Sequence, residues 1–131
     1  MYGSSKHLPY KFSAVELGIL KTDPKINKLG SWTKVIMPHC DGSFFQGYNK
    51  DPVDHNGTKL YFRGSANMRS NLKWIDLKYN LNKAEKIVFA GTSIGGAAVM
   101  LWIDELKAMV SEPEKVYGIL DSSIMHNPSI P

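Results

Sequence analysis

One apolar segment that runs straight into a glycine-flanked serine constrains the fold of this chain more than any other feature. Residues 86–90 read KIVFA, a nearly continuous apolar run of the kind found in parallel strands that are buried on both faces. Residues 91–95 read GTSIG and fit the G-x-S-x-G pattern, in which a serine stands on a sharp turn from a strand to a helix. Because a helical pattern begins directly after Ser93, the context that this motif needs is present.

The spacing of the motif has a physical reason. The serine hydroxyl must project above the sheet from a tight turn, and side chains at Gly91 and Gly95 would collide with the neighbouring strand or helix. Gly96 adds a small residue where the helix passes close to the sheet. We predict that Ser93 is a nucleophile with a strained backbone, and that the Ile94 N–H at the helix N-terminus stabilises an oxyanion.

Two other interpretations of this turn are less favoured. A G-x-S-x-G match is weak by itself, and an ordinary glycine-rich turn from a strand to a helix is the alternative. A phosphate-binding loop is disfavoured because the sequence lacks both the P-loop lysine and a G-x-G-x-x-G pattern.

Strands alternate with helices along the chain, which predicts an α/β fold with a mostly parallel sheet and helices on both faces. Ser93 and Asp121 both follow the ends of predicted strands, where catalytic groups gather in such sheets. Ser65 is the predicted N-cap of the first helix. We predict strands at 34–37, 59–62, 86–90 and 116–120, helices at 65–79 and 94–110, and a long polar loop from 39 to 58.

The composition is that of a single globular domain. The 131 residues suffice for one compact domain, with 43% hydrophobic and 21% charged residues. No apolar run is long enough to span a membrane, and no apolar signal segment follows Met1. The net charge of +4 comes from lysines spread along the chain, without the clustering of a nucleic-acid site. We expect no cofactor, and no metal because no His or Cys pair has zinc-ligand spacing.

Four histidines are candidates for the catalytic base. His7 and His55 lie in polar, irregular stretches, and His39 is interpreted as structural. His126 follows Asp121 and obeys the order Ser, acid, His, but the fold draws its acid and histidine from different strand ends. We therefore expect Asp121 to organise the loop near the nucleophile rather than to form a triad with His126.

Several motifs together resemble the pectin acetylesterase and Notum-type carboxylesterase family. The segment 91–96 resembles the family's nucleophile motif, which usually has Cys or Ser before the serine and Ala after it, where this chain has Thr92 and Ile94. Further similar segments occur in the family's order and at compatible spacing: 3–6 (GSSK), 18–20 with 23–25, Trp32, 40–44 (CDGSF), 62–64 (FRG) and 120–122 (LDS).

The resemblance implies an α/β-hydrolase with a Ser-His-Asp triad that removes small acyl groups from carbohydrate or protein. The family's Gly-Gly-Trp oxyanion loop precedes a segment like 3–5, and its acid and histidine follow a segment like 121–122. Residues 1–131 are thus expected to form a single incomplete α/β-hydrolase domain with little activity of its own. The disulfide partner of Cys40 is expected outside the chain in the same way.

The function that the resemblance implies is a serine carboxylic ester hydrolase that removes acetyl groups from a pectin-like polysaccharide, outside the cell or in the secretory pathway. A Notum-like deacylase of proteins and a non-catalytic binding module are the alternatives, the latter because of Thr92 and Ile94. In a secreted protein, residues 56–58 (NGT) form a glycosylation sequon. The aromatic residues Phe44, Phe45 and Tyr48 either line a substrate groove or pin the long loop to the core. No oligomeric state is indicated.

Overall fold

The computed structural model describes residues 18–123. Residues 1–38 and 39–131 form two compact units, each taken by itself. In the first unit, the short 3-10 turn η2 (Gly18–Leu20) is followed by turns in which the Asn27 amide donates to two backbone carbonyls. The strand predicted at 34–37 is absent, because no described segment pairs with it and Val35 and Ile36 stay 39% and 44% exposed. β-branched side chains form a strand only where a neighbouring strand accepts their backbone hydrogen bonds.

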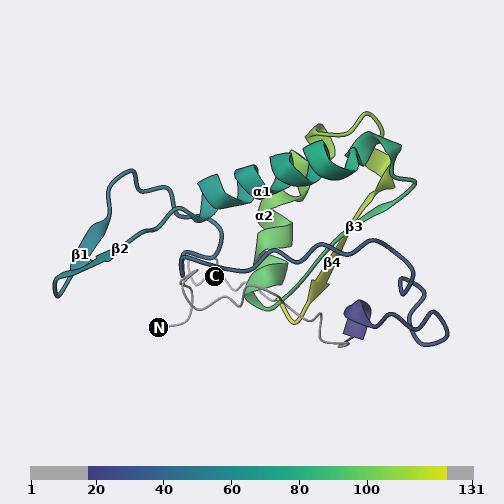
Figure 1. Cartoon of the computed structure of the whole chain (residues 1–131), viewed down its shortest axis with the longest axis horizontal. Helices are drawn as coiled ribbons and strands as arrows, with labels where there is room; N and C mark the ends of the chain where they lie inside the picture. Colours follow the sequence, from purple (N-terminus) through teal and green to yellow (C-terminus); the bar gives the residue numbers. More distant parts are fainter. Residues whose placement is uncertain (1–17, 124–131) are drawn as a thin grey trace, which may run out of the picture. The chain divides into compact units, whose positions relative to one another are not determined.

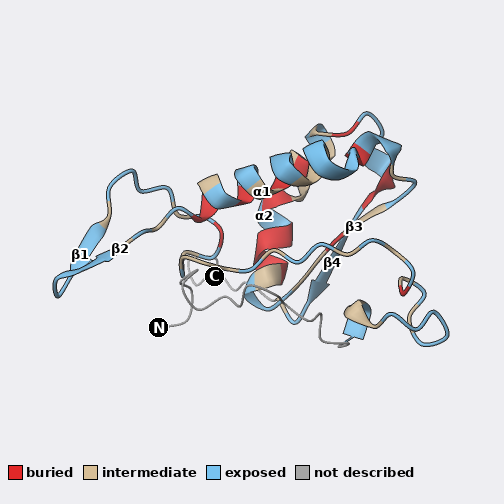
Figure 2. Cartoon of the chain, in the orientation of Figure 1, coloured by how far each residue is buried: buried red, intermediate tan, exposed pale blue. Residues whose placement is uncertain are grey.

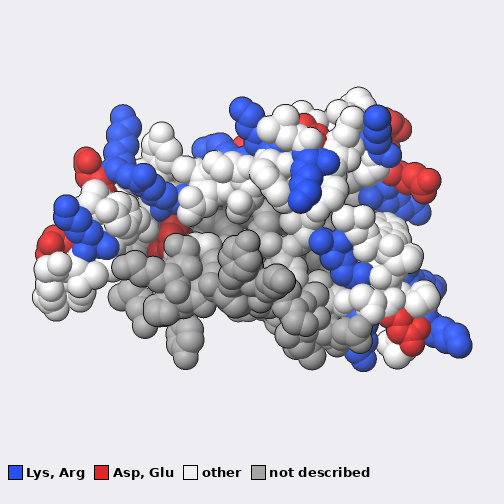
Figure 3. All heavy atoms as spheres, viewed as in Figure 1, with Lys and Arg blue, Asp and Glu red and all other residues white. Residues whose placement is uncertain are grey.

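The second unit contains two helices, two small sheets and two short 3-10 turns among its described residues (Figure 1). Neither helix is long and apolar enough to cross a bilayer, within residues 18–123. On the face in Figure 3, the Lys and Arg side chains that are drawn are scattered among acidic and other residues. The elements are β1 (Val53–His55), β2 (Thr58–Leu60), α1 (Gly64–Tyr79), η3 (Leu81–Lys83), β3 (Ile87–Thr92), α2 (Ile94–Ala108), η4 (Pro113–Lys115) and β4 (Val116–Asp121).

A hairpin interrupts the predicted loop at 39–58. β1 pairs with β2 in antiparallel register, with His55 opposite Thr58, so that only Asn56 and Gly57 form the turn. Both turn residues have positive φ, 50° and 76°, which Asn-Gly pairs tolerate in two-residue hairpins. The strand predicted at 59–62 is therefore shorter, lies at 58–60 and is antiparallel. The sheet is only partly parallel in the described residues.

The parallel pair β3–β4 and the helix α2 that connects them form the core of the unit. The register runs from Ile87 opposite Val116 to Thr92 opposite Asp121. α2 packs on the face of the pair that carries Gly118, where any side chain would meet Val99 of α2. Figure 2 shows buried residues concentrated along α2 and on parts of α1 and β3.

The opposite face of the parallel pair is open within residues 18–123. Tyr117 and Ile119, which alternate with Gly118 along β4, are 50% and 39% exposed. The expectation of strands buried on both faces with helices on each side is therefore met on one face only in the described part of the chain. Successive side chains of a strand point to opposite faces of the sheet, so Gly118 faces α2 while Tyr117 and Ile119 lie on the open face.

α1 begins one residue earlier than predicted. Ser65 is not its N-cap; it lies in the first turn, is buried, and donates from Oγ to the carbonyl oxygen of Gly47 at 3.0 Å. Arg63 takes the N-cap position without a capping side-chain bond. The helix starts early because Gly64 allows a very close approach of the loop backbone at Phe45, 2.8 Å from where a Cβ would stand.

Candidate functional site

Ser93 lies on the turn between β3 and α2, at the carboxyl end of a parallel strand, as the motif predicts. Its side chain is exposed, and its backbone angles are φ 55° and ψ −117°. A non-glycine residue in this region costs about 1–3 kcal/mol, so the expected backbone strain is present. The turn therefore leaves Ser93 exposed at the carboxyl end of β3.

The glycines of the motif serve different purposes. A Cβ on Gly91 would overlap the backbone carbonyl of Gly95 and stand 2.7 Å from the amide nitrogen of Gly96. A Cβ on Gly95, in contrast, would meet no described atom within 4 Å. The predicted collision is therefore found at Gly91, whereas no described residue stands close enough to cause one at Gly95. The open space beside Gly95 exists because no further element of residues 18–123 packs against this turn.

Hydrogen bonds join the turn at Ser93 to the end of β4 and to the loop that follows it. Ser93 N–H donates to the Asp121 carbonyl oxygen at 2.9 Å, and Thr92 Oγ1 donates to Asp121 Oδ2 at 3.2 Å. Ser122 Oγ donates to the other carboxylate oxygen at 3.1 Å. Ser123 Oγ lies 2.8 Å from the Ser93 carbonyl oxygen. These contacts agree with the organising role that was expected of Asp121.

Neither histidine of the described part reaches the Ser93 hydroxyl by a hydrogen bond. His39 Nε2 accepts the backbone N–H of Phe44 at 3.0 Å, which supports its structural interpretation. His55 lies in the exposed strand β1. His7 and His126 lie outside the described residues, as does the segment 3–6. Residues 18–123 contain no cluster of His, Cys, Asp or Glu that could hold a metal ion.

The loop that precedes α1 is built on Asp41. Its carboxylate accepts the backbone N–H of Ser43 at 3.0 Å and the Ser43 hydroxyl at 2.6 Å. Partial burial, and secondly the neighbouring Asp41 carboxylate, raise the pKa of the Cys40 thiol above its ordinary value. Phe44 and Phe45, which follow Ser43, both have positive φ, 54° and 61°. The indole Nε1–H of Trp102 donates to the Phe45 carbonyl oxygen at 3.1 Å and holds this strained loop against α2.

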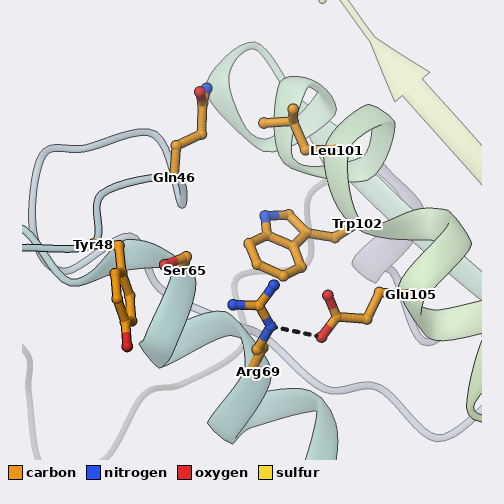
Figure 4. A pocket seen from close by; sticks show the side chains of 7 residues that line it. All are labelled: Gln46, Tyr48, Ser65, Arg69, Leu101, Trp102 and Glu105. Carbon is orange, nitrogen blue, oxygen red and sulfur yellow. Dashed lines mark hydrogen bonds and ion pairs between the residues drawn. The ribbon is translucent and has the colours of Figure 1, made fainter.

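The aromatic side chains of this loop differ in burial, and only Phe45 is seen in one of the two predicted roles, that of pinning the loop to the core. Phe45 is buried and pins the loop to the core, whereas Phe44 is exposed. Tyr48, which is 65% exposed, lines an open cavity of about 390 Å³ beside α1 and α2 (Figure 4). Arg69 in this cavity donates from Nε to Glu105 at 3.0 Å and lies over the Trp102 ring. No residue of the turn at Ser93 lines the cavity, so the two sites are separate.

Sequence reasoning missed the contact between Ser123 and the Ser93 carbonyl. The two residues are 30 positions apart, and only the parallel register of β3 with β4 brings them together. No local signal marks Ser123, since a serine after a strand is common in turns.

This chain is similar to known proteins over most of its length. A family model described as Pectinacetylesterase matches residues 1–129. "Palmitoleoyl-protein carboxylesterase NOTUM" from Schmidtea mediterranea is 30% identical over 111 residues, which cover 81% of this chain and 20% of that protein. "Pectin acetylesterase 7" from Arabidopsis thaliana is 29% identical over 124 residues, which cover 93% of this chain and 30% of that protein. No solved structure matches. The chain thus spans less than a third of either relative.

Proposed function

Because the chain belongs to the pectinacetylesterase family, we propose that it is part of a carboxylic ester hydrolase in which Ser93 is the nucleophile. The observation that carries this proposal is the exposed Ser93 on a strained turn at the carboxyl end of a parallel strand. This arrangement directs a hydroxyl away from the backbone toward a substrate and leaves a helix N-terminus beside it.

The proposed reaction proceeds through an acyl-enzyme. Ser93 Oγ attacks the ester carbonyl carbon while a base removes its proton, and the carbonyl oxygen becomes a tetrahedral oxyanion near the Ile94 N–H. Collapse of this intermediate breaks the ester bond, and the proton passes to the departing alkoxide. Water then hydrolyses the acyl-serine by the same steps and releases the acid.

The proposed substrate is an O-acetyl ester on a pectin-like polysaccharide, and the proposed place of action is therefore outside the cell or in the secretory pathway. The family description and the Arabidopsis relative support this choice. The planarian relative, named for action on palmitoleoyl-protein, supports a deacylase of proteins as the second candidate. Rates on chromogenic esters with acetyl and with long acyl chains distinguish the two, because a long chain needs a deep apolar pocket.

We further propose that residues 1–131 belong to a single incomplete α/β-hydrolase domain and have little or no esterase activity alone. Within residues 18–123, no base is hydrogen-bonded to Ser93, and the Ile94 N–H is the one oxyanion donor that we propose. Loss of one such donor costs about 10²–10³ in rate, and a serine without a base is a poor nucleophile. The exposed Tyr117 and Ile119 also favour a further layer on that face of the sheet.

The test uses the protein as its gene encodes it, compared with residues 1–131 alone. A fluorophosphonate probe should label Ser93, and Ser93→Ala should lower hydrolysis of an acetyl ester by several orders of magnitude. Ser70→Ala, at an exposed position of α1, is the matched control and should change neither result. Labelling or hydrolysis that survives Ser93→Ala would refute the proposed nucleophile. Absence of both in the parent protein, with retained binding to pectin, would favour a binding module.

A further inference from the structure

Three donors hold the carbonyl oxygen of Ser93. The backbone N–H groups of Gly96 and Ala97 lie 3.0 and 3.2 Å from it, as at the start of a helix. The third donor is the Ser123 hydroxyl at 2.8 Å, which comes from the loop after β4. This third bond is not part of α2, so it ties the strained turn to the neighbouring strand.

The direction of this carbonyl determines where the next backbone N–H points. No described peptide bond is cis, and in a trans peptide the C=O and N–H point to opposite sides. The Ser93 carbonyl points into the first turn of α2 and toward Ser123, so the Ile94 N–H points the other way. Ile94 is the first residue of α2, and its N–H has no partner within the helix.

We propose that Ser123 is a positioning residue for the esterase reaction, because its hydroxyl fixes the plane of the Ser93–Ile94 peptide and thereby aims the Ile94 N–H at the oxyanion. This inference rests on the proposed function. A donor that is already aimed needs no reorganisation when negative charge develops, and this is the main advantage of an enzyme site over water.

Packing around Ser123 supports this role. Gly96 faces Ser123 so closely that a Cβ at position 96 would overlap the Ser123 side chain. The Ser123 hydroxyl is also 2.9 Å from the Asp121 carbonyl oxygen, which accepts the Ser93 N–H. A hydroxyl has one hydrogen, so it donates to one of the two carbonyls at a time. Only the bond to the Ser93 carbonyl joins the loop after β4 to the turn, and it is the shorter of the two, whereas the bond to the Asp121 carbonyl stays within that loop and its strand.

The test compares Ser123→Ala with Ser122→Ala in the protein as its gene encodes it. The Ser122 hydroxyl donates to the Asp121 carboxylate and makes no hydrogen bond to Ser93, so Ser122→Ala controls for the loss of a hydroxyl in the same loop. Ser123→Ala should lower kcat on an acetyl ester roughly 10-fold or more, less than the loss of a whole donor, while KM changes little. Affinity for a trifluoromethyl ketone, which forms a tetrahedral adduct on serine, should fall by the same factor as kcat/KM.

The outcomes separate the inference from the function on which it rests. A folded Ser123→Ala variant with parental kcat overturns the positioning role, and so does an equal loss in Ser122→Ala. If Ser123→Ala does not fold, Gly96→Ala displaces the Ser123 side chain instead, and parental kcat in that variant overturns the role. A parent protein that neither hydrolyses esters nor reacts with a fluorophosphonate overturns the proposed function, and the inference with it.

Discussion

Two glycines of the turn, Gly91 and Gly95, should respond in opposite ways to the same substitution. A Cβ on Gly91 would overlap the backbone carbonyl of Gly95 and lie 2.7 Å from the Gly96 nitrogen. All these atoms belong to the backbone, so no change of side-chain rotamer relieves the overlap. A Cβ on Gly95 would have no described atom within 4 Å.

The magnitudes follow from this difference. Overpacking costs about 1–3 kcal/mol, and a backbone overlap at an already strained turn should reach the upper end of this range for Gly91→Ala. Gly95 lies in the first turn of α2, where alanine is favoured over glycine by up to about 1 kcal/mol. The two variants should therefore differ in free energy of unfolding by about 3–4 kcal/mol, or roughly 10 °C in Tm.

Thermal unfolding of residues 1–131, followed by far-UV circular dichroism, measures this difference between the two variants. Gly91→Ala should unfold well below the parent protein, and Gly95→Ala at or slightly above the parental Tm. Equal destabilisation by both substitutions would refute the reasoning, because it would mean that a segment outside residues 18–123 packs against Gly95. A Gly91→Ala variant as stable as the parent would refute the geometry of the turn itself.

Two further predictions concern the loop before α1 and the hairpin. Burial, and secondly the Asp41 carboxylate, raise the pKa of the Cys40 thiol. In residues 1–131 kept under a reducing agent that does not react with iodoacetamide, alkylation of this thiol should therefore be slow near neutral pH and reach half-maximal rate at higher pH than for an ordinary cysteine. Asp41→Asn should move this midpoint to lower pH, and an unchanged midpoint would exclude the carboxylate as a cause. Asn56 lies at an exposed hairpin tip within a sequon, so secretion from a eukaryotic host should add a glycosidase-sensitive mass that Asn56→Gln removes. An unmodified secreted protein would contradict this.

The strand–turn–helix–strand segment was predictable because its signals are local. The predicted strand at 86–90 is found at Ile87–Thr92, and the predicted helix at 94–110 is found at Ile94–Ala108. Apolar periodicity indicates both elements, and the glycine-flanked serine indicates the turn between them.

The errors fall where distant contacts decide the local structure. The segment 34–37 has the composition of a strand but no described partner, so it stays extended and partly exposed. Ser65 has the identity of an N-cap, yet its hydroxyl binds the Gly47 carbonyl because the preceding loop packs against the start of α1. Asn56-Gly57 has the composition of a two-residue hairpin turn, but a hairpin also needs two paired strands, which the predicted polar loop at 39–58 did not include.

The sequence by itself determined that this chain contains a strand, a strained serine turn and a helix in direct succession, because backbone preference and apolar spacing act over a few residues. Only the tertiary structure decided what surrounds the serine. The parallel register places Thr92 opposite Asp121 and so brings Ser123 to the Ser93 carbonyl, across 30 residues of chain. Such a contact depends on how two strands pair and how α2 packs on their face, and no local pattern encodes that pairing.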